Sequence, residues 1–191
     1  SFPDGSDFKN IFKTRLSRIN IDWPKENLLS FYNDGGSNEE VSLFLLEIEN
    51  QKITKILDEK KGFTIKWSKS GNYLLYSFFN FDNSLRLILK DMAEQKEYEL
   101  PFATFASKCA FGVDEKNIYC GVPLEMPQTP IKAEFVVSKD KIEKWNLETK
   151  KATVLLEPSD YEDIQIFSPF VSPLEDKLFF INLLDYRLYR L

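Results

Sequence analysis

Short apolar runs alternate with polar turns along the whole chain, and one such phrase returns four times. Each copy starts at an aromatic or apolar anchor, passes through a polar turn into an apolar run, and adds further apolar runs separated by polar turns. The anchors are Trp23, Trp67, Phe111 and Val171, spaced 44, 44 and 60 residues apart. Four strands in a unit of roughly 40–45 residues is the period of a β-propeller blade.

The apolar runs set the expected strand positions. The predicted strands are Leu28–Tyr32, Val41–Ile48, Lys52–Leu57, Tyr73–Phe79, Leu85–Leu89, Lys96–Leu100, Ile118–Cys120, Lys141–Leu147, Ala152–Leu156, Leu178–Ile181 and Tyr186–Leu191. No segment shows the 3.6-residue period of an amphipathic helix. We therefore expect an all-β protein with no helix longer than a turn or two.

Several predicted strands are apolar on both faces. Val41–Ile48 and Leu178–Ile181 show little alternation, whereas a sheet with one face in water alternates apolar and polar residues. Propeller blades pack against a neighbour on each side, which buries both faces. A β-sandwich would also bury its strands, but the repeat of the whole phrase favours a propeller.

The repeat predicts a single domain over residues 1–191, built of four four-stranded antiparallel blades. The blades cover residues 17–57, 58–100, 101–156 and 157–191. The last of them ends after a third strand, while Ile11–Leu16 resembles a closing strand with no blade of its own. Either these residues complete the last blade of a closed four-bladed ring, or the chain is the C-terminal part of a larger propeller. Pairing is expected in both cases, because open sheet edges promote aggregation.

Composition supports the sheet assignment and restricts the partners. The chain has 17 Phe, 8 Tyr and 3 Trp, and aromatic side chains suit pleated surfaces. A net charge of -5 with no Lys/Arg run longer than a pair argues against nucleic-acid binding. No apolar run approaches the roughly 20 residues that a membrane span needs. The polar start Ser1–Asp7 resembles a turn rather than a native N-terminus, so we expect a fragment of a longer protein.

The phrase at the second anchor resembles a known propeller family. Residues 67–77 read WSKSGNYLLYS, similar to the WSPDGKYLAFS phrase of TolB-like propellers with WD-like repeats. Residues 171–180 are a second match, and the segments after Trp23 and Phe111 are weaker ones. The resemblance spans nearly the whole chain and implies the propeller fold, although Phe111–Asp114 lacks the Ser-Pro-Asp-Gly turn.

The segment order also resembles an uncharacterised bacterial subgroup, through residues 108–111 and 117–123. Similar proteins carry an N-terminal membrane anchor ahead of further blades, which implies an extracytoplasmic location for this chain, periplasmic or on the cell surface. Propellers of this type serve as binding platforms, as periplasmic scaffolds, and as gating domains of prolyl-oligopeptidase-like hydrolases.

Candidate chemistry is sparse. The chain has no His, so it lacks the usual general base and the commonest metal ligand. It shows no nucleophile elbow, phosphate loop or dinucleotide fingerprint, and we expect no enzyme activity, metal or cofactor. Two acidic groups, Glu39–Glu40 and Asp160 with Glu162 and Asp163, are typical of solvated turns. The oxygen-rich segment Asn33–Glu40 has the residues of a hairpin loop rather than a calcium loop.

Two cysteines flank the predicted turn at Asp114–Asn117. If Cys109 and Cys120 face each other on neighbouring strands, their Cβ atoms lie within disulfide reach. Both stand in apolar strand context, so two buried free thiols are the alternative.

The segment Gly121–Lys139 lengthens the third copy. It carries three prolines among the apolar residues Leu124, Met126, Ile131 and Phe135. A stiff loop with apolar side chains on a rigid scaffold is a typical recognition element, and the alternative is a loop folded back on its own blade. A recognition loop predicts that the chain is a non-catalytic scaffold or recognition propeller that binds a protein or peptide. A second hypothesis is the regulatory propeller of a hydrolase whose catalytic domain lies outside this chain.

Overall fold

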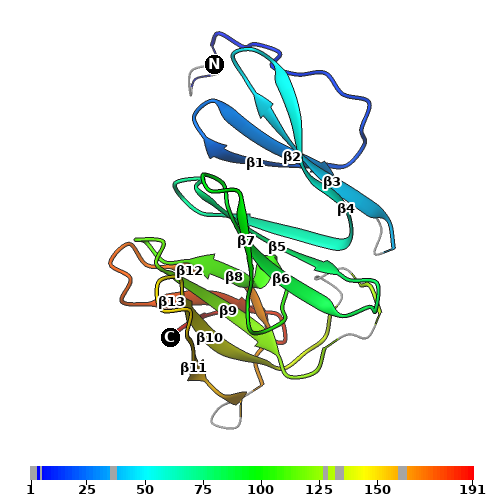
Figure 1. Cartoon of the computed structure of the whole chain (residues 1–191). Coiled ribbons are helices and arrows are strands. Elements are labelled where there is room, and N and C mark those ends of the chain that lie inside the picture. The colour runs from blue at the N-terminus through cyan, green and yellow to red at the C-terminus, as the bar shows by residue number, and fades with distance from the viewer. Residues whose placement is uncertain (1–3, 5, 35–37, 127–128, 132–135, 159–162) are drawn as a thin grey trace. The chain divides into compact units, whose positions relative to one another are not determined.

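The computed structural model describes all residues except 1–3, 5, 35–37, 127–128, 132–135 and 159–162 (Figure 1). Within the described residues the regular structure is almost all strand, and the helical part is limited to the 3₁₀ turn η1 (Ala106–Lys108) and a 3₁₀ position at Pro158. The prediction of an all-β protein is confirmed. The chain divides into two compact units, residues 1–34 with 41–59 and residues 35–40 with 60–191, and each is described by itself.

The first unit is an antiparallel sheet. It contains β1 (Ile19–Lys25), β2 (Leu28–Asn33), β3 (Glu40–Glu47) and the first half of β4 (Lys52–Trp67), paired in that order. An aromatic stack joins its strands, with the Phe31 ring centroid 5.5 Å from that of Phe44. The predicted strands of the first copy therefore form as expected.

Strand β4 is where the sheets depart from the prediction. Its 16 residues run without a break from the first unit into the second, where Lys61 lies opposite Phe79 and Trp67 opposite Leu74. The result is one seven-stranded order, β1 to β7, in place of two separate four-stranded blades. The polar run of residues 58–61 followed by Gly62 reads as a turn in the sequence, yet it lies within the strand. Gly62 has a φ of +59°, a Cβ there would lie 2.5 Å from the Phe79 ring, and the register with β5 shifts beside it.

The second repeat continues from β4 through a meander. Strands β5 (Tyr73–Phe79), β6 (Leu85–Asp91) and β7 (Lys96–Glu99) pair antiparallel in sequence order. Leu74, Leu75 and Tyr76 are all buried, so successive residues of β5, which point to opposite faces, are covered on both. That is the burial predicted for stacked sheets.

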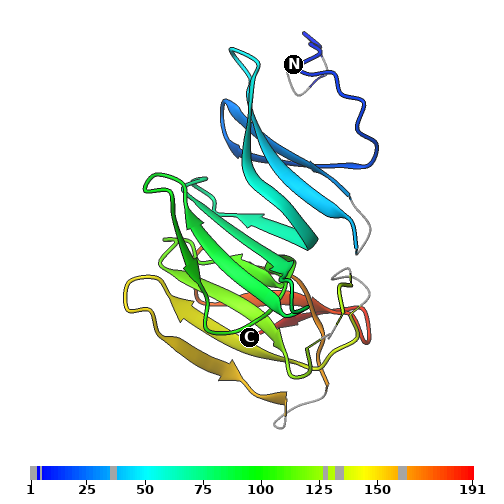
Figure 2. The same cartoon turned by 45° about the vertical axis from the view of Figure 1, so that its right-hand side comes forward.

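The third repeat is a four-stranded sheet of its own. It contains β8 (Cys109–Phe111), β9 (Asn117–Pro123), β10 (Asp140–Asn146) and β11 (Ala152–Leu156), in the order β11-β10-β9-β8 (Figure 2). The long connection between β9 and β10 coincides with the segment singled out in the sequence.

The fourth repeat has three strands, β12 (Ile166–Val171), β13 (Leu178–Asn182) and β14 (Arg187–Arg190). Residues Ile11–Leu16, which close the last blade in one of the two predicted arrangements, form no strand in this structure. Their polar side chains are exposed, and Phe12 contacts Phe31 of its own unit with ring centroids 5.2 Å apart. The sheets therefore do not show the closed four-bladed ring.

Two apolar clusters hold the repeats of the second unit together. The cluster between the second and third repeats consists of Leu75, Leu87, Leu89, Leu100, Phe102, Ala106, Cys109, Ile118, Cys120, Val122 and Trp145. The cluster between the third and fourth consists of Tyr119, Ile142, Ile164, Ile166, Leu178 and Phe180. Gly121 permits this second contact, because a Cβ there would lie 2.6 Å from the Cβ of Ile166. Neighbouring sheets thus pack face to face.

Candidate functional site

The β9–β10 connection lies partly on the core and partly at the surface. Met126 and Ile131 pack against a cluster of buried residues, Phe79, Leu85, Phe105 and Val136. Leu124, in contrast, is 51% exposed. Phe135 lies outside the described residues. Of the three predicted contact residues that the structure describes, Leu124 alone is an exposed apolar anchor, and the other two help to fix the loop on its own domain.

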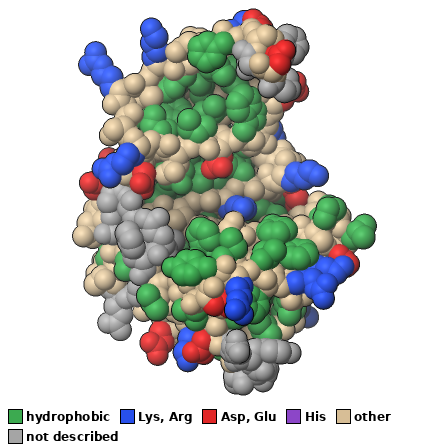
Figure 3. Space-filling model, turned by 180° about the vertical axis from the view of Figure 1, so that it is seen from behind, with side chains coloured by type: hydrophobic (Ala, Val, Ile, Leu, Met, Phe, Trp, Pro, Cys, Tyr) green, Lys and Arg blue, Asp and Glu red, His purple; other side chains and the backbone are tan. Residues whose placement is uncertain are grey.

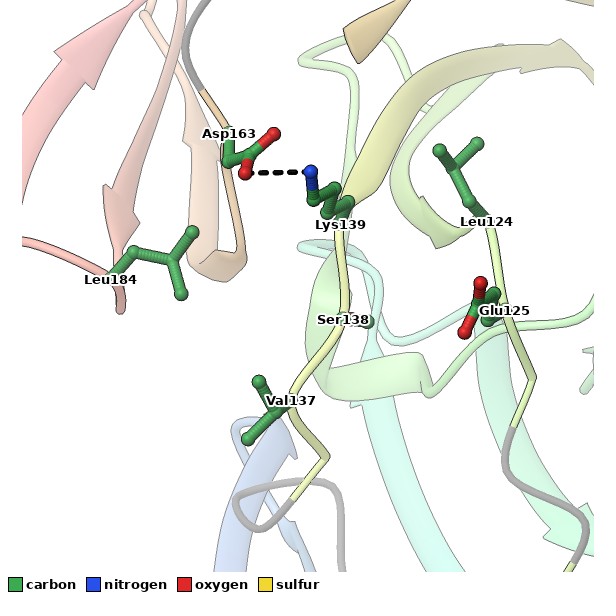
Figure 4. Close-up of a pocket in the computed structure, with 7 residues that line it drawn as sticks. All are labelled: Leu124, Glu125, Val137, Ser138, Lys139, Asp163 and Leu184. Carbon is green, nitrogen blue, oxygen red and sulfur yellow. Dashed lines mark ion pairs between the residues drawn. The ribbon is translucent and has the colours of Figure 1, made fainter.

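Leu124 lines a pocket of about 390 Å³ between the third and fourth repeats (Figure 4). The third repeat contributes Leu124, Glu125, Val137, Ser138 and Lys139, and the fourth contributes Asp163 and Leu184. We call this site the Leu124 pocket. Sequence reasoning found Leu124 and placed Asp163 in a solvated turn, whereas the remaining residues join the site only through the packing of two sheets.

The rim of the Leu124 pocket is aliphatic. Val137 is 86% exposed and Leu184 is 46% exposed, and both line the pocket together with Leu124 (Figure 4). Hydrophobic side chains are also visible elsewhere on the surface (Figure 3), and single exposed apolar residues are normal in soluble proteins. The pocket differs because three of them converge on one concave surface beside charged groups, which is the composition of ligand sites.

An ion pair between two lining residues joins the two repeats at the pocket. The Lys139 ammonium lies 2.7 Å from a carboxylate oxygen of Asp163, and both side chains are about half exposed (Figure 4). Within the described part of the chain, no hydrogen bond or ion pair engages the Glu125 carboxylate. Because an exposed ion pair contributes at most about 1 kcal/mol, the Lys139–Asp163 pair can exchange partners at small cost.

The lining residue Ser138 is hydrogen-bonded to a buried ion pair. Lys108, at the end of η1, donates from Nζ to both carboxylate oxygens of Asp140, at 2.9 and 2.7 Å, and to Oγ of Ser138 at 3.0 Å. Ser138 in turn donates to Asp140 over 2.7 Å. Burial lowers the pKa of Lys108, and the adjacent Asp140 carboxylate opposes that shift. The side chains of Lys108, Ser138 and Asp140 all have hydrogen-bond partners, and a satisfied buried network of this kind favours a single arrangement of its members.

Hydrogen bonds of Asp140 and Val136 join the third repeat to the fourth. The amide of Asp140 donates to the carbonyl of Ile164 at 2.8 Å, and the amide of Ile166 donates to the Asp140 carboxylate at 2.7 Å. The side-chain amide of Gln165 donates to the carbonyl of Val136. These bonds run between the two segments that carry the pocket walls, so the third and fourth repeats hold the pocket open together.

The two cysteines face each other next to this cluster. Cys109 of β8 lies directly opposite Cys120 of β9, and their sulfur atoms are bonded at 2.12 Å. Both residues are buried in the apolar cluster between the second and third repeats. Of the two states that the sequence leaves open, the structure has the disulfide.

Two glutamates link consecutive repeats through their turns. Glu175, in the turn after β12, accepts hydrogen bonds from the amide of Val113 at 2.9 Å and from the hydroxyl of Tyr119 at 3.0 Å. Glu115, in the corresponding turn of the third repeat, accepts from the amide and the hydroxyl of Ser70, both at 2.6 Å. The third repeat, which lacks the Ser-Pro-Asp-Gly turn, thus contacts the second repeat through its turn glutamate, as the fourth contacts the third.

The other candidate chemistry gives no site in the described residues. They contain no group of three or more His, Cys, Asp or Glu side chains placed to hold a metal ion. No helix among them is long and apolar enough to cross a membrane. Glu39 and Glu40 are exposed, whereas Asp160 and Glu162 lie outside the described residues.

No protein-family model matches the chain, and no curated protein sequence matches it. Solved structures do. The chain aligns with TolB from Acinetobacter baumannii at a TM-score of 0.63 and 11% identity, over 99% of this chain and 47% of TolB. The tricorn protease gives 0.59 and 13% over 85% of this chain and 15% of the protease. The β-propeller domain of the Trilobed protease from Pyrococcus furiosus gives 0.54 and 17%, over 90% of this chain and 55% of that domain.

These likenesses concern the fold alone, since the identities are low. They show that the chain has a TolB-like β-propeller fold, as the repeat and the WSKSGNYLLYS phrase predict. The chain spans less than two thirds of the length of each of these structures.

Proposed function

We propose that this chain is a non-catalytic propeller module that binds a protein or peptide partner at the Leu124 pocket. The observation that carries the proposal is the convergence of three exposed aliphatic side chains, Leu124, Val137 and Leu184, on one concave surface. The buried pair Lys108–Asp140 and the bonds to the fourth repeat fix that surface before any partner arrives. A preformed site loses little conformational entropy on binding.

The proposal is tested by selecting binders from a random peptide library displayed on phage. Peptides selected on the wild-type chain should lose binding to Leu124→Asp, because an acidic side chain replaces an apolar contact. The control is Leu174→Asp, since Leu174 is 85% exposed in the turn between β12 and β13 and does not line the pocket. Selected peptides that bind both variants as well as wild type would place the binding site elsewhere.

The finer architecture belongs to the same proposal. The second half of β4 with β5–β7, and β8–β11, each supply four strands in order, as propeller blades do. We place the chain in a larger ring, in which a strand from outside residues 1–191 pairs with β14 and completes the sheet of the fourth repeat. The chain matches less than half of TolB, which supports this arrangement over closure by Ile11–Leu16.

We place the module outside the cytoplasm. The disulfide between Cys109 and Cys120 supports this, because such bonds persist in oxidising compartments. The resemblance to an uncharacterised bacterial subgroup with an N-terminal membrane anchor supports it as well. Fusing the full-length gene to alkaline phosphatase tests the location, since that reporter is active only after export.

The second candidate is the regulatory propeller of a hydrolase. It is favoured by the likeness to the propeller domain of the Trilobed protease and to the tricorn protease. A fluorophosphonate probe, which labels activated serines, separates the two functions when it is applied to the full-length protein. Labelling of a domain outside residues 1–191 would support the hydrolase, and absence of labelling would support the recognition module.

A further inference from the structure

We propose that the Leu124 pocket is selective for a basic side chain, lysine or arginine, next to an aliphatic one in the partner peptide. This inference rests on the proposed function and adds the chemistry of its ligand. It follows from the charges of the pocket, from its aliphatic rim and from the state of the two lysines around it.

The charges of the pocket favour a cation. Among the described lining residues, Lys139 is neutralised by Asp163 at 2.7 Å, so the carboxylate of Glu125 gives this set one net negative charge. Glu125 follows Leu124 directly and faces the same concavity (Figure 4). An ammonium or guanidinium group that enters there can form a charge-assisted hydrogen bond with Glu125.

The same arrangement disfavours an anion. Among the described lysines, Lys139 lines the pocket and Lys108 contacts the lining residue Ser138, and each is already paired with a carboxylate. An acidic ligand could draw Lys139 away from Asp163 at small cost, but its charge would then lie beside the carboxylates of Glu125 and Asp163 with one ammonium among them. The buried Lys108 offers no second cation, because breaking its pair with Asp140 would leave a buried charge without a partner. The pocket therefore discriminates by charge sign, as complementary interfaces do.

The rim determines what stands beside the cation. Leu124 and Leu184 belong to opposite walls, and Val137 lies between them (Figure 4). Aliphatic side chains of this size gain free energy by removing apolar area from water. A leucine, isoleucine or valine next to the basic residue would cover this surface, and a long basic side chain adds the apolar part of its own stem.

The sharpest consequence is that two substitutions shift affinity in opposite directions. Glu125→Gln removes the attracting carboxylate and should weaken binding of a basic peptide by about three- to tenfold. Lys139→Gln removes the internal cation that occupies Asp163, and it should strengthen binding by about the same factor. A structural disturbance of the pocket would weaken binding in both variants.

Fluorescence anisotropy with three labelled peptides, which carry Leu-Lys-Leu, Leu-Gln-Leu or Leu-Glu-Leu in one neutral framework, tests the inference. The lysine peptide should bind the wild-type chain tightest, with an affinity that falls as salt rises. Glu94→Gln is the matched control, because Glu94 lies in the turn between β6 and β7 and does not line the pocket. It should leave the affinity unchanged.

Three results of the anisotropy measurements would overturn the inference. They are tighter binding of the acidic peptide, equal binding of all three peptides, and weaker binding of the lysine peptide by Lys139→Gln. If the phage library returns peptides without basic residues that still depend on Leu124, the proposed function stands and this inference fails. If no library peptide and none of the three defined peptides binds, both fail.

Discussion

Two glutamates adopt a backbone conformation that usually belongs to glycine. Glu115 has φ +59° and Glu175 has φ +56°, at the turn position where the second repeat has Gly71 with φ +66°. A left-handed backbone costs a non-glycine residue about 1–2 kcal/mol. Both glutamates offset that cost by hydrogen bonds to the preceding repeat. These side-chain contacts explain why glutamate, and not glycine, occupies this turn position.

Glu175 is therefore expected to stabilise the second unit. Glu175→Ala should lower the free energy of unfolding by about 1–3 kcal/mol, because the hydroxyl of Tyr119 and the amide of Val113 lose their acceptor. Glu175→Gly should be less destabilising than Glu175→Ala by about 1 kcal/mol, since glycine accepts the left-handed backbone. Urea unfolding of the three proteins measures both differences, and equal values for the two variants would contradict the role of backbone strain.

Tyr119 makes stability depend on pH in the alkaline range. Burial, its hydrogen bond to Glu175 and the charge of that carboxylate raise the pKa of Tyr119 from 10.0 to about 12. Between these values the unfolded chain has lost the phenol proton and the folded chain still holds it. Stability is therefore complete below pH 10 and falls as pH rises towards 12.

Urea unfolding between pH 9 and about pH 11.5 measures this loss. Tyr119→Phe should make the decline shallower. Burial also raises the pKa of Tyr32 to about 12 and that of Tyr76, so part of the decline should remain in the variant. An unchanged slope would show that Tyr119 does not contribute.

At the scale of elements, the strands could be predicted and their combination could not. Strands β5 and β11 have the predicted bounds, Tyr73–Phe79 and Ala152–Leu156, because apolar runs between turn residues are a local signal. The length of β4 could not be predicted, since it depends on the pairing of residues 61–67 with β5 and on the space that Gly62 leaves for the Phe79 ring. Contacts between residues that are far apart in the sequence cannot be predicted from the local pattern of apolar and polar residues.

The same limit applies to the anchors and to the site. Trp23 and Trp67 occupy corresponding places in the repeat, yet Trp23 is 56% exposed while Trp67 is partly buried. The apolar residues and prolines of the β9–β10 connection drew attention to Leu124. Asp163 and Leu184 come from the next repeat, and only the packing of two sheets brings them to the pocket.

The buried pair Lys108–Asp140 joins η1 to β10 and should be the costliest polar contact to break. Asp140→Asn removes the charge and leaves the buried Lys108 ammonium uncompensated. We expect a loss of about 3–5 kcal/mol in the free energy of unfolding. The double variant Lys108→Met with Asp140→Asn should recover part of that loss, and urea unfolding measures both. A double variant that is less stable than the single one would contradict this explanation.

The disulfide between β8 and β9 should resist chemical modification until it is reduced. In denaturant, Cys109 and Cys120 should not react with an alkylating reagent before reduction. After reduction the chain should take up two equivalents of the reagent, which mass spectrometry counts. Reduction should lower the free energy of unfolding by about 2–3 kcal/mol, because the unfolded chain gains freedom. Alkylation of the unreduced protein would indicate two free thiols instead.

At the scale of the whole molecule, the two proposed arrangements of the propeller differ in which strand pairs with β14. In a larger ring a strand from outside residues 1–191 occupies that edge, and deleting residues 1–16 should leave hydrogen exchange of the Arg187–Arg190 amides unchanged. In a ring closed by Ile11–Leu16, the deletion would expose those amides to faster exchange. Hydrogen–deuterium exchange of both proteins distinguishes the two, and faster exchange would contradict the proposed arrangement.

The glutamate contacts also have a direction, and it matches the direction of protein synthesis. Glu115 of the third repeat binds Ser70 of the second, and Glu175 of the fourth binds Val113 of the third. Each acceptor carboxylate therefore leaves the ribosome after the donors that it needs, so a new repeat finds its docking position already made. No repeat of the second unit has to wait for a later one to satisfy its turn glutamate, which suits a protein that folds as it is translated.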